Sequence, residues 1–119
     1  MAVTKNLTVD QGSTYVHNFT VQESNGDATD LTNYSARLQV RRSYDNSNVI
    51  LEATNVNNKI NVDASNGILR LTLLPADTSN IGFTGANLEA VYDLEIESIA
   101  GVVTRLIEGS FTIDREVTR

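Results

Sequence analysis

Apolar and polar residues alternate without interruption between positions 36 and 41 of this chain. Successive side chains of an extended chain point to opposite sides, so this period of two predicts a strand with one buried and one exposed face. The expected buried side is Ala36, Leu38 and Val40, and the expected exposed side is Arg37, Gln39 and Arg41. The pattern constrains the fold strongly and says nothing about function.

The same alternation recurs between turn signals along the sequence. The segments that it predicts to be strands are residues 5–9, 15–21, 34–42, 49–53, 60–62, 69–73, 90–97 and 105–113. Asn-Gly pairs at 25–26 and 66–67 supply the positive φ angles that tight turns need. About eight strands at a spacing of about ten residues are typical of an all-β, antiparallel β-sandwich. Residues 75–81 are the one segment expected to be helical, for one or two turns.

Length and composition limit the classes of protein that remain. A chain of 119 residues predicts one domain, residues 1–119, with a core that needs no disulfide, and there is no cysteine to form one. The net charge of −6 argues against nucleic acid as a partner, because phosphate binding requires a basic surplus. The apolar runs are too short to cross a membrane, and the first six residues show no secretory signal.

The residues that usually carry catalysis or bind metals are sparse. His17 alternates with Tyr15 and Phe19, which favours a partly buried structural histidine over a catalytic base. The carboxylates at 93, 95 and 97 share the exposed side of a strand rather than a cleft. The loops 27–30 and 45–48 offer oxygen ligands but do not fit the EF-hand pattern, so a weak Ca²⁺ site there is only a minor alternative. We therefore expect no enzyme activity, cofactor or metal site.

Two positions bear on the finer topology. Tyr92 stands two residues before the inward Leu94, as a tyrosine does at the corner of immunoglobulin-like sandwiches, where its hydroxyl bonds back to the preceding crossover. The alternative is a core aromatic with a solvated hydroxyl. Gly109, in the middle of the last strand, indicates either a bulge or a close backbone approach.

Five residues are candidates for a protein interface. The row of Arg37, Gln39 and Arg41 is a candidate docking face on an acidic chain, the alternative being a plain solvated face. Tyr44 and Phe83 are aromatics in loops, and each either covers an end of the sandwich or contacts a partner.

Four phrases in order resemble small tailed-bacteriophage virion proteins. Residues 30–41, DLTNYSARLQVR, resemble their DLTGYTARMQVR stretch, and residues 66–73, NGILRLTL, are similar to their G-x-I-x-L-x-L strand. Residues 92–96, YDLEI, resemble YDLEL, and residues 101–109, GVVTRLIEG, resemble GxVTRLLEG. The ending at 116–119 is similar too, and the whole chain more loosely resembles the N-terminal domain of the phage baseplate upper protein family.

This resemblance implies an immunoglobulin-like virion structural protein, made in the cytoplasm of a bacterial host and assembled in many symmetric copies with other virion proteins. The expected role is non-enzymatic: a tail, baseplate or neck adaptor that acts by protein–protein contacts. A capsid decoration protein is the first alternative. A carbohydrate-binding module for host recognition is a further one, which the absence of tryptophan and the four tyrosines disfavour. The resemblance transfers no catalytic residue.

Overall fold

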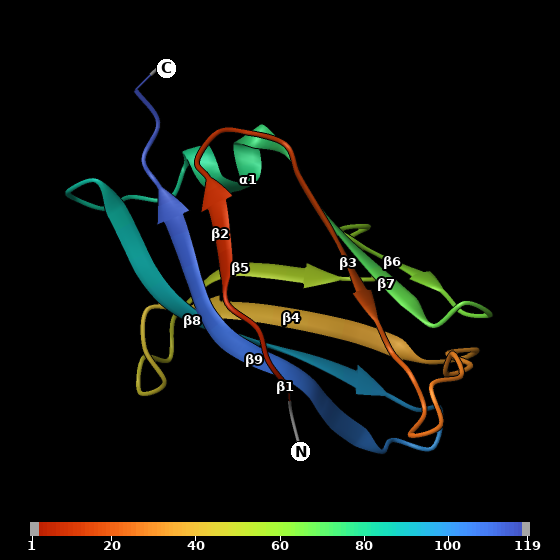
Figure 1. Ribbon diagram of the computed structural model, residues 1–119. Coiled ribbons are helices and arrows are strands. Elements are labelled where there is room, and N and C mark those ends of the chain that lie inside the picture. The colour runs from red at the N-terminus through yellow and green to blue at the C-terminus, as the bar shows by residue number, and fades with distance from the viewer. Residues whose placement is uncertain (1–2, 118–119) are drawn as a thin grey trace.

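The computed structural model describes residues 3–117, which form two β-sheets packed face to face and one short helix (Figure 1). The elements in chain order are β1 (Val3–Thr4), β2 (Leu7–Asp10), β3 (Tyr15–Thr20), β4 (Ser35–Arg41), β5 (Val49–Thr54), β6 (Ile60–Asp63), β7 (Ile68–Leu73), α1 (Pro75–Ser79), β8 (Asn87–Glu97) and β9 (Val103–Asp114). The predicted all-β sandwich with one helical turn is confirmed.

The strand order is that of an immunoglobulin-like sandwich. The larger sheet has the order β1-β9-β8-β4-β5, with β2 also paired to β9, and the smaller sheet has the order β3-β7-β6. These orders match strands G, F, C and C′ facing strands B, E and D. Pairing is antiparallel in the described residues except where β1 and β2 run parallel to β9. The predicted antiparallel sandwich therefore has one mixed edge, where β1 and β2 lie beside β9 before the chain crosses to the smaller sheet.

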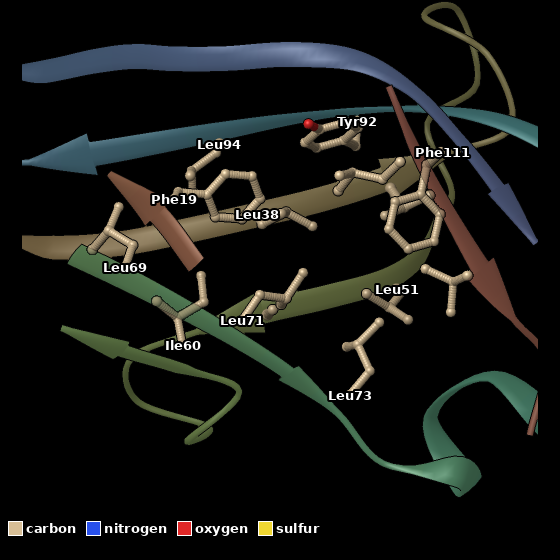
Figure 2. Close-up of a cluster of buried hydrophobic side chains, with 14 of the residues drawn as sticks. Phe19, Leu38, Leu51, Ile60, Leu69, Leu71, Leu73, Tyr92, Leu94 and Phe111 are labelled. Carbon is tan, nitrogen blue, oxygen red and sulfur yellow. The ribbon is translucent and has the colours of Figure 1, made fainter. Parts of the chain in front are cut away.

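The hydrophobic core lies between the sheets and joins residues from both (Figure 2). In β4 the alternation predicted from the sequence is confirmed, since its apolar residues are buried and Arg37 is exposed. Leu38, Leu71 and Leu94 have no exposed surface. Complete burial of a leucine side chain stabilises a fold by about 1.5–3 kcal/mol, so these three are major contributors.

Helix α1 closes one end of the sandwich and is tied to the turn after β2. The Gly12 N–H donates a 2.8 Å hydrogen bond to the hydroxyl of Thr78, which is fully buried. The Gln11 side-chain amide donates to the backbone carbonyls of Thr78 and Ile81, each at 3.3 Å. These bonds satisfy polar groups where the helix meets the core, as burial requires.

A bulge changes the facing of the first residues of β9. Leu94 lies opposite Ile107, but Glu95 lies opposite Arg105, so Leu106 is an extra residue in β9. Strict alternation along residues 105–113 would put Arg105 on the same side of the strand as Ile107, and the bulge breaks that alternation. The bulge turns Arg105 to the outer face of the sheet, where it forms an ion pair with Asp93.

The break between β1 and β2 brings a backbone carbonyl against β8 and β9. The hydroxyl of Tyr92 donates a 2.7 Å hydrogen bond to the Lys5 carbonyl, and Tyr92 lies opposite Gly109. A Cβ atom at Gly109 would overlap that carbonyl oxygen, which confirms the predicted close backbone approach. The tyrosine-corner hypothesis is wrong, because the hydroxyl bonds to Lys5, between β1 and β2, instead of to the crossover before β8.

Candidate protein-interaction surface

The outward side chains of β4, β8 and β9 form one polar surface on the larger sheet. Its members, here called the charged sheet face, are Arg37, Gln39, Arg41, Tyr44, Asp93, Glu95 and Arg105. Strand register places these side chains together, since Arg37 lies opposite Glu95 and Gln39 lies opposite Asp93. Together they line a shallow hollow of about 330 Å³.

Hydrogen bonds and an ion pair organise the β4 row within this face. The Arg37 guanidinium lies 3.1 Å from the Glu95 carboxylate, and the Gln39 amide donates a 2.6 Å hydrogen bond to Glu52. Arg41 donates to the Gln39 side-chain oxygen at 3.2 Å and to the Asn46 carbonyl at 3.2 Å. The row is therefore ordered before any partner arrives, which lowers the entropic cost of binding.

The β8–β9 side of the same face concentrates negative charge. Asp93 pairs with Arg105 at 3.3 Å, and Arg105 also lies 4.0 Å from Glu108. Burial raises the pKa of the Asp93 carboxyl, as does the Glu95 charge, while the Arg105 charge opposes both. A basic group from a partner would relieve the repulsion between the Asp93 and Glu95 carboxylates, so this part of the face suits a cation.

The two predicted loop aromatics have different surroundings. Tyr44, in the loop between β4 and β5, is 73% exposed and borders the hollow, so it lies beside Arg37, Gln39 and Arg41. Phe83, in the loop after α1, is half-buried and packs against the core. Phe83 therefore covers an end of the sandwich and does not line the charged sheet face. The Arg42 guanidinium donates a 2.6 Å hydrogen bond to the Gly82 carbonyl and holds that loop in place.

His17 is surrounded by aromatic rings. Its ring lies edge-on to Phe19, with centroids 4.7 Å apart, and is stacked 6.4 Å from Tyr15. Burial, and then the charge of Lys5, lower the pKa of His17. His17 is partly buried, as the sequence predicted. No group of three or more His, Cys, Asp or Glu residues that could hold a metal ion is found among residues 3–117.

A second surface, which sequence reasoning missed, lies along the free edge of β3. Here called the β3-edge groove, it is a hollow of about 460 Å³ between β3 and the starts of β1 and β9. The lining residues are Val3, Lys5, His17, Asn18, Phe19, Thr20, Val21, Gln22, Thr104, Arg105, Leu106 and Ile107. The sequence signal for β3 was clear, but only the strand order shows that one side of β3 is unpaired.

No protein-family model matches the chain, and no curated protein matches it. Within residues 3–117, no helix is long and apolar enough to span a lipid bilayer.

Proposed function

We propose that this chain is a non-enzymatic structural protein of a tailed-bacteriophage virion, an adaptor of the tail, baseplate or neck that acts through protein–protein contacts. The virion is its site of action, after synthesis in the bacterial host, and its partners are other virion structural proteins in symmetric copies. The charged sheet face is the proposed contact surface.

The observation that carries this proposal is the position of the phage-like phrases in the fold. Three of the four coincide with β4, β8 and β9, which are adjacent in the larger sheet. The resembling phrases contain the same residue types at the outward positions Arg37, Gln39, Arg41, Asp93, Glu95, Arg105 and Glu108. Folding alone asks only that outward positions be polar, so agreement in residue type supports a shared surface role. Residues 118–119 of the similar ending lie outside the described residues.

The chemistry of the charged sheet face suits recognition of a folded protein. Its hollow is lined by an exposed aromatic ring, Tyr44, and by Arg41, and these residue types are enriched among the anchors of protein interfaces. Cations and carboxylates are both present, so a partner surface with the complementary arrangement of charges would be selected over others.

The test starts with purified virions of the proposed phage, whose genome would encode the chain. We expect mass spectrometry to detect the protein in them and gold labelling of a tagged copy to mark the tail, baseplate or neck in negative stain. Label on the head would contradict the adaptor role and favour capsid decoration. Absence from purified virions would overturn the structural role altogether.

A matched pair of variants tests the contact surface itself. Tyr44→Ala removes a side chain that is 73% exposed, so it should leave the stability of the domain unchanged while reducing incorporation into virions. Asn61→Ala removes an exposed side chain from β6 in the other sheet and should leave incorporation unchanged. Equal incorporation of both variants would exclude Tyr44 from the contact.

A further inference from the structure

The edges of the two sheets differ in their protection against pairing with another strand. Proteins commonly block such edges with short strands, charges or bulges. β1 has two residues, β2 and β6 have four each and end in aspartate, and β5 contains Glu52 and faces a register shift in β4. β3 has six residues in unbroken register with β7, and His17 is its only titratable side chain apart from Tyr15. Among the described residues, β3 is therefore the edge without these protections.

The hydrogen-bond pattern of β3 identifies the backbone groups that face outward. Just beyond β3, the Val21 N–H donates a 2.7 Å hydrogen bond to the Gly67 carbonyl. Hydrogen-bonded and non-bonded pairs alternate along an antiparallel ladder. The odd-numbered residues of β3 thus bond to β7, and the N–H and C=O groups that point to the free edge belong to Val16, Asn18 and Thr20.

An apolar surface lies next to this edge, inside the β3-edge groove. Phe19 is buried, and Leu106 and Ile107 are partly buried and pack against the core from the larger sheet. Val3, at the margin of the groove, is 66% exposed. Side chains from a strand added beside β3 would cover these residues, since alternate residues of such a strand point between the two sheets.

The charges around the β3 edge are basic, although the whole chain carries a net charge of −6. Lys5 and Arg105 line the groove, and no aspartate or glutamate does. Arg105 is paired with Asp93, but no carboxylate of residues 3–117 forms an ion pair with Lys5. Arg70, on the neighbouring strand β7, donates a 3.1 Å hydrogen bond to the neutral side chain of Asn18.

We propose that the free edge of β3 binds an extended acidic segment of a partner protein, which adds to the smaller sheet as a fourth strand. Main-chain hydrogen bonds to Val16, Asn18 and Thr20 would provide affinity, apolar side chains would enter the β3-edge groove, and carboxylates would meet Lys5 and Arg70. A second copy of β3 fits less well. That strand carries no carboxylate for Lys5 and Arg70, and the pairing would bring the basic side chains around the two edges together. The inference does not depend on the virion role, since the β3-edge groove and the charged sheet face share only Arg105.

A synthetic strand peptide tests this inference directly. The probe has about eight residues in which valine alternates with glutamate or threonine, and its control has lysine in place of glutamate. We expect titration calorimetry to show that the acidic peptide binds about tenfold more tightly. Amide hydrogen exchange should slow at Val16, Asn18 and Thr20 when it binds.

Two chain variants locate the binding. Thr20→Pro removes an N–H that β7 does not use, so the domain should fold but lose peptide binding, whereas Thr20→Ala should bind like the unaltered chain. Lys5→Glu should reduce the preference for the acidic peptide. If Thr20→Pro does not fold, this variant alone tests whether the peptide binds at the β3 edge. Equal binding of both peptides, slowed exchange at β5 or β6 instead of β3, or self-association through β3 without peptide would each overturn the proposal.

Discussion

The hydroxyl of Tyr92 donates a 2.7 Å hydrogen bond to the backbone carbonyl of Lys5, 87 residues earlier in the chain. Tyr92 is 2% exposed, and burial, with the neighbouring Tyr15, raises the pKa of its hydroxyl, which therefore stays protonated as a donor. We expect Tyr92→Phe to lower the free energy of unfolding by about 1–2 kcal/mol, because the Lys5 carbonyl loses its partner. Urea denaturation measures this, and Tyr44→Phe, at an exposed ring, should cause no change.

At Gly109, even the addition of a single methyl group is expected to destabilise the fold. A methyl group there would overlap the Lys5 carbonyl oxygen, which is backbone and cannot rotate away. We expect Gly109→Ala to cost at least about 1–3 kcal/mol of unfolding free energy, through displacement of the segment between β1 and β2. Gly82→Ala is the control, since nothing lies within 4 Å of a Cβ at that position. Equal thermal stability of the two variants would show that the approach to Lys5 is not tight.

The two faces of β4 can be distinguished by the same substitution at adjacent positions. Leu38→Asp places a carboxylate without a partner where the side chain has no exposed surface, so the domain should not fold. Arg37→Asp removes an ion pair whose arginine side chain is 55% exposed, and should cost at most about 1 kcal/mol. Circular dichroism during heating compares them. An unfolded Arg37→Asp variant beside a stable Leu38→Asp variant would reverse the assignment of the faces.

Asp77 links the stability of the fold to pH. Burial alone would raise the pKa of Asp77, but hydrogen bonds from Lys59, at 2.6 Å, and the Leu74 N–H, with the Lys59 charge, lower it overall. A carboxyl whose pKa is lowered by folding stabilises the fold above its unfolded pKa, near 3.8, and loses that contribution as pH falls through its folded pKa.

The corresponding measurement compares urea denaturation at about pH 6 and about pH 2. Asp77→Asn should lower stability at the higher pH and lose less stability than the unaltered chain on acidification. Asp45→Asn, in an exposed loop, makes the same change in net charge and serves as the control. If the unaltered chain and Asp77→Asn lost the same stability on acidification, Asp77 would not contribute to the loss of stability in acid.

The sequence predicted strands and their facing well, because alternation records directly which side of a strand is buried. β4 is the clearest case, and Leu38 and Arg37 lie on the predicted sides. The bulge at Leu106 could not be predicted, since neither glycine nor proline marks it and it depends on how β9 pairs with β8.

Long-range pairing limited what could be predicted about the surfaces. The row on β4 was identified as polar, but the partner of Arg37 is Glu95, 58 residues away, and only the sheet register brings them together. The β3-edge groove was missed for the same reason: the sequence of β3 is equally compatible with a central and an edge position. Gln11 and Thr78 were also overlooked, because a polar residue that is buried and hydrogen-bonded at long range resembles a surface residue in the sequence.

The parallel pairing of β1 and β2 with β9 also determines how the domain would respond to a pulling force. The chain leaves the sandwich at opposite ends, through β1 and through β9 (Figure 1). Tension applied between these two ends would run along the paired strands and load their cross-strand hydrogen bonds together in shear. Bonds loaded in this way must break together, whereas in a hairpin pulled from its open end they break one at a time. The fold therefore has a mechanically resistant connection between its terminal strands.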